Sequence, residues 1–415
     1  MKELFFVHRL SNGLTLVCER MAHVVSAAMD LAVPLGAARD GRELAGAAAL
    51  ISEWLLRGAG RRDSRQLNEA LDHLGCQHDE SVHSEWLHLS AAQIHQNLRD
   101  VLNLYGDIVR RPRLGAETFE PCRDLALQEL AGLPDQPSRK CMLELVERFY
   151  PAPLGASPLG SSEALAAMTD DACRRHARRW LAPEGTILAV AGQVDWDALV
   201  GWAEEIFGGW TGAAFEPPAT TAAAGGIAQE TRDTAQVQIA LAYDAPTIDS
   251  EHYYPARLAE MVLSGGMSGR LFTEVREKRG LVYSVSARYR AVKGAAGMFV
   301  YAGTTPQRAQ QTLDVTVGEL KRLAADGITE QELTTGKTQL KSALIMQGER
   351  TSARAGGLVG DWHLLGRLRS LEEIAAAVDA VSVEQVGACL KAYPPEAFTG
   401  YFIGPQPLNT DGLEG

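Results

Sequence analysis

Residues 263–285, LSGGMSGRLFTEVREKRGLVYSV, place a glycine-rich turn, a short helix and a strand in immediate succession. The turn at 265–269 contains three glycines, which favour irregular backbone. Apolar residues at helical spacing predict a helix over 271–278. The β-branched and aromatic residues that follow predict a strand over 282–289.

The first half of the chain repeats this pattern. Leu67, Leu71, Leu74, Gly75 and Cys76 correspond in place and order to Leu271, Val275, Arg279, Gly280 and Leu281. The turn at 113–117 likewise corresponds to the turn at 327–330. The two halves therefore read as diverged repeats.

A linker separates the halves. Residues 208–226, GGWTGAAFEPPATTAAAGG, are rich in Gly, Ala, Pro and Thr and have no apolar period. We predict an N-terminal domain over 1–210, a linker over 211–227 and a C-terminal domain over 228–415. Within each domain, helices are mixed with hairpin-like strand pairs and do not alternate strictly with strands. This order predicts α+β halves, each with a mainly antiparallel sheet covered by helices on one side.

The composition is that of an acidic globular protein. The 415 residues carry a formal net charge of -12, and 46% of them are hydrophobic. Nucleic acids and anionic membranes are bound through clustered Lys and Arg, so we expect neither as a partner. The six cysteines form no C-x-x-C pair, which indicates buried, reduced thiols. The sequence shows no long apolar run and no signal-peptide pattern, which predicts a cytoplasmic location, or a periplasmic one if a leader has been removed.

Three segments resemble the pitrilysin or insulinase family of inverzincin zinc metallopeptidases, in the branch of the mitochondrial processing peptidase. They are RLSNGLTLV at 9–17, YPAPLGASPLGSSE at 150–163 and, most specifically, residues 263–285. The resemblance covers nearly the whole chain. It implies two homologous halves arranged as a clamp around a peptide-binding chamber.

Active members of that family carry H-x-x-E-H on a helix of the first half, where two His bind zinc and the Glu activates water. Here the matching helix reads GAAALISEWLLRG at 46–58, with Leu50 and Trp54 at the two ligand positions. Glu53 keeps the place of the base, and Glu129 lies where the third ligand would be. Leu and Trp offer no lone pair to zinc, so we expect no metal, no cofactor and no zinc peptidase activity in this chain alone.

The second half of active members supplies an Arg and a Tyr that hold the substrate carbonyl and stabilise the oxyanion. Arg276 and Tyr283, with six residues between them, match that pair. The combination is similar to bacterial two-subunit peptidases in which one chain carries the zinc motif and the other the Arg/Tyr pair. The resemblance implies a non-catalytic subunit that binds peptide substrate and completes the active site of a homologous zinc-bearing partner, which alone holds the zinc.

Other functions stay open at this point. The chain could be an inert module that holds an extended peptide by strand addition and presents a precursor peptide to a partner. It could also be a structural subunit, since core proteins of a respiratory complex resemble the same family. For the individual residues, the alternatives are a solvated or salt-bridged relic at Glu53 and likewise at Glu129, a surface ion pair at Arg276 and a half-buried ring at Tyr283.

Two further patterns bear on ligand binding. His73, His78, His83 and His88 recur every five residues, a period that fits neither a helix nor a strand. Only His83 and His88 could meet, across a hairpin, and a metal site there competes with ordinary surface histidines. The turn at 265–269 precedes a helix but lacks a P-loop Lys, so we expect no nucleotide site.

Overall fold

The structure is a computed structural model that describes residues 4–413. The chain forms two compact units. Unit 1 comprises Met1–Gly132, Ala156–Thr220 and Gln347–Leu368, and unit 2 comprises Leu133–Gly155, Thr221–Met346 and Arg369–Gly415. Each unit therefore includes one segment from the other half of the sequence. The predicted division at 211–227 follows the sequence halves and differs from the compact units at these two segments.

Unit 1 is built on a six-stranded sheet in the order β1-β2-β8-β3-β7-β6. Its strands are β1 (Leu4–Arg9), β2 (Thr15–Arg20), β3 (Ser26–Val33), β6 (Gln77–Val82), β7 (Leu87–Ile94) and β8 (Ile187–Gly192). Neighbouring strands are antiparallel except for the parallel pair β2 and β8. A separate small hairpin joins β4 (Gly58–Ala59) and β5 (Arg62–Asp63).

Seven helices contribute to one hydrophobic core with alternate strand residues such as Met29 and Leu31. They are α1 (Ala47–Leu55), α2 (Ser64–His73), α3 (Leu98–Arg110), α4 (Ala116–Gly132), α6 (Ser162–Ala167), α7 (Asp170–Trp180) and α8 (Trp196–Phe207). The strand residues between them, such as Ala28 and Ala32, belong to a second core on the opposite face. Both faces of the sheet are therefore apolar.

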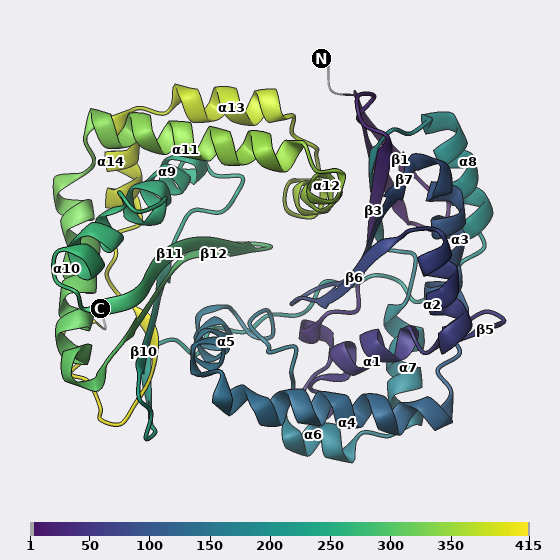
Figure 1. Cartoon of the computed structure of the whole chain (residues 1–415), viewed down its shortest axis with the longest axis horizontal. Coiled ribbons are helices and arrows are strands. Elements are labelled where there is room, and N and C mark those ends of the chain that lie inside the picture. The colour runs from purple at the N-terminus through teal and green to yellow at the C-terminus, as the bar shows by residue number, and fades with distance from the viewer. Residues whose placement is uncertain (1–3, 414–415) are drawn as a thin grey trace. The chain divides into compact units, whose positions relative to one another are not determined.

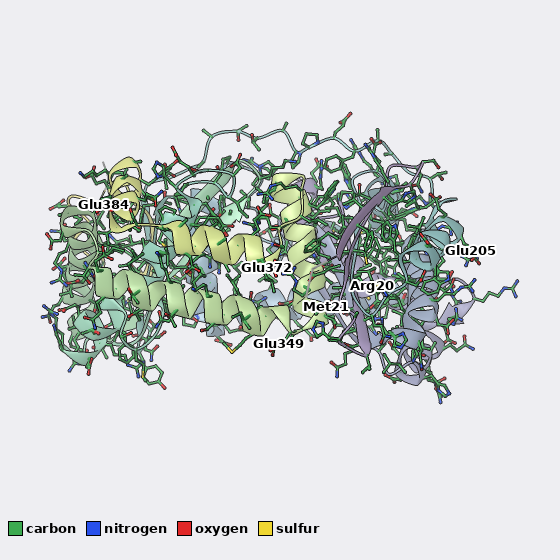
Figure 2. All side chains as sticks on the ribbon, turned by 90° about the horizontal axis from the view of Figure 1, so that it is seen from above. Arg20, Met21, Glu205, Glu349, Glu372 and Glu384 are labelled. Atoms are coloured by element: carbon green, nitrogen blue, oxygen red, sulfur yellow. The ribbon has the colours of Figure 1, made fainter. Side chains whose placement is uncertain are left out.

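The second face of the unit 1 sheet is covered by α12 (Thr351–Leu365), which lies beside β3 (Figure 1). Met21, labelled in Figure 2, is buried in the same cluster as the α12 residue Leu358. One ion pair and one side-chain hydrogen bond fasten the helix near its ends. Arg354 binds Glu19 at 2.6 Å, and the His363 Nε2 atom lies 2.8 Å from Glu85.

Unit 2 is built on a five-stranded sheet in the order β11-β12-β10-β13-β9. Its strands are β9 (Ile227–Thr231), β10 (Val237–Asp244), β11 (Val282–Val292), β12 (Ala295–Thr304) and β13 (Thr399–Gly404). Only β13 and β9 are parallel. One face packs on a helical layer formed by α9 (Tyr253–Ser264), α10 (Ala309–Asp326), α11 (Glu330–Gly348), α13 (Leu371–Ala380) and α14 (Val383–Ala392).

The other face of the unit 2 sheet is partly covered by α5 (Pro137–Phe149), which packs on β10 and β13. The Cys141 Sγ atom lies 2.9 Å from the carbonyl oxygen of Tyr401. At the end of the helix, the ring of Phe149 meets the ring of Phe299 on β12 edge to face at 5.0 Å. The cover provided by α5 therefore reaches β12.

The predicted α+β class, with mainly antiparallel sheets covered by helices, is confirmed. The expectation of helices on one side only is wrong, because α12 and α5 each cover a second face. The sequence pattern gave no sign of α12, whose glycines at 356, 357 and 360 weaken both helix propensity and apolar period. A Cβ atom at Gly356 would lie 3.7 Å from Asp30 of β3, an ordinary van der Waals contact, so Gly356 faces the sheet. The clamp arrangement stays a prediction.

Candidate functional site

The helix that corresponds to the zinc helix is α1, and its start is fixed by a buried carboxylate. Asp40 accepts hydrogen bonds from the amides of Gly46 and Ala48 at 3.2 and 3.1 Å. The His176 Nε2 atom lies 3.0 Å from the same carboxylate. Burial raises the pKa of Asp40, against the effect of these hydrogen bonds. The N-terminus of α1 is thereby tied to α7.

Both positions of α1 that the resemblance aligns with zinc ligands are part of the hydrophobic core. Leu50 is 1% exposed and Trp54 is 0% exposed. The indole N–H of Trp54 donates to the carbonyl oxygen of Gly115 at 3.1 Å and to Thr118 Oγ1 at 2.9 Å. The Trp54 ring also packs against Phe119 of α4, with 5.0 Å between ring centroids. Trp54 therefore packs α1 against α4, and its only polar side-chain atom, the indole nitrogen, is hydrogen-bonded.

Glu53 and Glu129, the two carboxylates that the resemblance assigns to a zinc site, lie on different helices, α1 and α4. Glu53 forms an ion pair with Arg57 on the next turn of α1, so the ion-paired alternative describes this residue. Glu129 lies on α4 and is exposed. Within residues 4–413, no group of three or more His, Cys, Asp or Glu side chains could hold a metal ion. The residues at this position therefore do not fit a catalytic zinc ion, which needs three protein ligands.

The histidine series is dispersed, as its period predicts. His73 ends α2, and His78 lies on β6 beside Glu80 at 3.0 Å. His83 and His88 do meet, with ring centroids 5.0 Å apart, but the Nδ1 atom of His88 is 3.0 Å from Asp30. His78 and His88 therefore lie beside carboxylates, and the His83 ring lies against the His88 ring.

The Arg/Tyr pair is assembled in unit 2 by two irregular backbone elements. Arg276 lies on η4 (Phe272–Glu277), a short π-helix, and Tyr283 is the extra residue of a β-bulge at the start of β11. The Arg276 guanidinium is 5.3 Å from the centre of the Tyr283 ring and 4.9 Å from that of Phe272. π-Helical turns and bulges recur at functional sites because they re-aim side chains.

Both side chains are available to a ligand. Tyr283 is 82% exposed, which corrects the alternative of a half-buried ring. Arg276 is exposed as well. Neither side chain has a hydrogen bond or ion pair with another residue in the part of the chain that the structure describes. The surface ion pair considered for Arg276 is therefore not formed.

The segment that carries Arg276 is fixed by ion pairs at both ends. Arg270 binds Glu332 through two contacts of 2.7 and 2.8 Å, and this ion pair lowers the pKa of Glu332 to about 2. Glu274 accepts from Lys278 at 2.6 Å and from Arg279 at 2.7 Å, which lowers the pKa of Glu274 to about 2. These contacts hold η4 in place while leaving Arg276 free.

Sequence reasoning did not find these supporting residues. One signal was present: Thr329-x-x-Glu332 has the form of a capping box, and the Thr329 amide does donate to Glu332 at 2.8 Å. The partner Arg270 is 62 residues away in the chain, so its role depends on the tertiary fold.

The chain is similar to known proteins along most of its length. Residues 11–160 match the model of the insulinase family, peptidase family M16, and residues 167–340 match that of the peptidase M16 inactive domain. An uncharacterized zinc protease of Mycobacterium leprae is 30% identical over 404 residues, which cover 95% of this chain and 91% of that protein. An uncharacterized zinc protease of Bacillus subtilis is 24% identical over 399 residues, covering 95% and 97%.

Two solved structures share the fold. A peptidase M16 inactive domain from Pseudomonas fluorescens has a TM-score of 0.88 at 20% identity and covers 99% of this chain and 100% of its own. A protease from Helicobacter pylori has a TM-score of 0.90 at 18% identity, covering 98% and 100%.

The chain therefore belongs to the insulinase family of peptidases, family M16, as its sequence predicts. The match to the inactive domain and the apolar side chains at positions 50 and 54 together indicate a non-catalytic member. Among the helices of the described residues, none has both the length and the apolar character that a membrane span requires.

Proposed function

We propose that this chain is the non-catalytic subunit of a heteromeric zinc peptidase, in which it binds peptide and supplies Arg276 and Tyr283 to the active site of a zinc-bearing homologue. One observation supports this proposal above others. The zinc helix is filled by core side chains, whereas Arg276 and Tyr283 are exposed and have no competing polar partner among the described residues. A pair that only stabilised the fold would be expected to form internal hydrogen bonds.

The chemistry of the pair suits a peptide bond under attack. The guanidinium of Arg276 and the hydroxyl of Tyr283 can both donate hydrogen bonds to a peptide carbonyl oxygen. As that oxygen gains charge, donors already aimed at it stabilise the transition state more than the ground state. The ion pairs of Glu274 and Glu332 restrict the movement of η4, so little reorganisation is needed.

The test is an activity assay with three samples: this chain, a homologue that carries H-x-x-E-H, and their mixture. We expect cleavage to appear or rise sharply in the mixture only. In the mixture, Arg276→Ala and Tyr283→Phe should each lower kcat about 100-fold or more, the effect of removing one donor to an oxyanion.

A matched control tests whether the loss of a cation anywhere in unit 2, and not only at Arg276, lowers the activity. Lys391 is an exposed cation on α14 of the same unit, and Lys391→Ala should leave the activity of the mixture unchanged. Unchanged activity with both Arg276→Ala and Tyr283→Phe would contradict the proposal. Zinc-dependent cleavage by this chain alone would contradict it as well.

A second candidate function is an inert peptide-binding module. It is favoured by the open edge of β6, which among residues 4–413 pairs only with β7 and lies next to α1. An extended peptide could bind there by adding a strand. In that case the mixture would gain nothing from Arg276 and Tyr283, and peptide binding to this chain would survive both substitutions.

A further inference from the structure

One face of β11 in unit 2 is polar and cationic. Its register with β12 places Ser284, Ser286, Arg288 and Arg290 on the same face as Gly303, Tyr301, Phe299 and Gly297. We call the four β11 residues the Arg288 face. The alternate residue Ala287 points to the helical core. The Arg288 face is thus directed away from the layer of α9 and α10.

Within the described part of unit 2, the helix that packs most extensively on β11 is α9, which lies on the opposite face. The helix α5 covers β10 and β13, and its last residue, Phe149, ends against Phe299 of β12. Arg288 and Arg290 are exposed, and the Arg290 guanidinium is 5.5 Å from the Phe299 ring. The side of the sheet is therefore covered as far as β12 and open over β11.

The cations of this strand lack acidic partners. Arg288, Arg290 and, in the turn that follows, Lys293 form no ion pair with any residue in the range 4–413. The nearest candidate by register is Asp244, which lies on the same face of β10, beyond Gly297. Phe149 packs so closely over Gly297 that a Cβ atom there would lie 2.4 Å from the ring, which places an aromatic ring between the two charges.

The strand also has a free hydrogen-bonding edge. β11 is the first strand of its sheet and pairs only with β12 among the described residues. Cations on an edge strand oppose pairing with a second copy of the same strand, because like charges would face each other. The same cations favour an added strand that carries carboxylates.

We propose that β11 binds an extended acidic peptide by strand addition, with Arg288 and Arg290 recognising carboxylates at positions i and i+2 of that peptide. The inference rests on the proposed peptide-binding function and specifies its substrate class. It also gives a spacing. Tyr283 and Arg288 are five residues apart on the strand, about 17 Å at 3.3–3.4 Å per residue. A peptide bond held at Tyr283 should therefore have an acidic pair roughly five to seven residues away.

The test uses three labelled peptides of roughly 12 residues, enough to span β11 at about 3.3 Å per residue. They share one sequence and differ only at the two alternate positions, which hold Glu, Gln or Lys. Binding to the full chain is measured by fluorescence anisotropy. We expect the Glu peptide to bind about three- to tenfold more tightly than the Gln peptide, with the advantage shrinking as salt increases.

Variants of the strand test the residues themselves. Arg288→Glu combined with Arg290→Glu should remove the preference for Glu and favour the Lys peptide. The matched control is Arg175→Glu combined with Lys391→Glu, which changes the net charge equally at exposed positions outside β11. If the first pair prevents folding, as judged by circular dichroism, Arg288→Glu alone serves. A Glu peptide with alternate N-methylated amides should bind weakly, because it cannot pair with the strand edge.

The outcomes separate the inference from the proposed function. Equal binding of all three peptides overturns the inference and leaves peptide binding intact. A Glu preference that survives both β11 substitutions also overturns it, as does undiminished binding of the N-methylated peptide. A dimer that the β11 substitutions dissociate would show that a second copy occupies the edge. Failure of every peptide to bind would contradict the proposed function itself.

Discussion

At the scale of single residues, Trp54 shows how a large side chain at an expected ligand position packs into the core. Its ring lies against Phe119, and its N–H reaches Gly115 and Thr118 at the start of α4. A large side chain thus occupies the ligand position, and its polar atom is satisfied as a buried donor must be. The sequence alone predicted the loss of both His ligands. It could not predict the acceptors on α4, which lie 61 and 64 residues away.

Trp54→Phe should therefore lower the free energy of unfolding by about 2 kcal/mol. The substitution removes the buried donor and leaves a small cavity. Urea denaturation measures the change. The control is Trp202→Phe, since Trp202 is half-buried and has no side-chain hydrogen bond within the described range. Equal effects of the two substitutions would show that the Trp54 hydrogen bonds contribute nothing.

At the scale of elements, the start of α11 supports the segment that carries Arg276. Glu332 caps α11 through Thr329 and also binds Arg270 just before η4. One carboxylate thereby joins two elements. The helix and strand around residues 271–289 were predictable from local pattern. The π-helical turn and the bulge at Tyr283 were not, because they depend on how η4 and β11 pack in the unit.

The ion pair of Glu332 gives a pH dependence with a defined sign. Its pKa is about 2 in the folded chain and near 4.5 ordinarily, so its stabilisation is full above pH 4.5 and is lost as the pH falls toward 2. Glu332→Gln should lower the free energy of unfolding by about 1–2 kcal/mol at pH 7, allowing for partial exposure of the pair. The difference from wild type should shrink below pH 4.5.

Urea denaturation at several pH values measures this difference. Glu330→Gln is the matched control, because Glu330 lies in the first turn of the same helix and its side chain has no ion pair in the described chain. A difference between wild type and Glu332→Gln that stays constant from pH 7 to pH 3 would rule out the ion pair as its source.

At the scale of the whole molecule, each unit depends on a helix from the other half of the sequence. Without residues 347–368, the unit 1 sheet would expose apolar residues that α12 now buries. They are Val17, Ala28, Ala32, Ile187, Ala189 and Ala191. The repeat pattern and the linker predicted two halves but not this exchange, since the apolar period of α12 is weak and its partners lie on distant strands.

Residues 1–210 produced alone should bind the hydrophobic dye ANS strongly and unfold without a sharp transition. Addition of residues 228–415, which contain α12, should reduce the dye signal and restore cooperative unfolding. Fluorescence and thermal denaturation give both readings. A fragment 1–210 that already unfolds cooperatively and binds no dye would show that α12 is dispensable for unit 1.

The pairing of Glu19 with Arg354 also determines when unit 1 can finish folding during translation. Glu19 and Arg354 are separated by 335 positions, and the last strand of the unit 1 sheet ends at Gly192, whereas α12 ends only at Leu365. The second face of this sheet therefore stays uncovered on the ribosome until nearly the whole chain has emerged. At about 5–20 residues per second, the synthesis from Gly192 to Leu365 takes roughly 9–35 s. During that time an apolar sheet face is open to chaperones and proteases. We therefore expect the nascent chain to depend on chaperones more than two independently folding halves of the same size would.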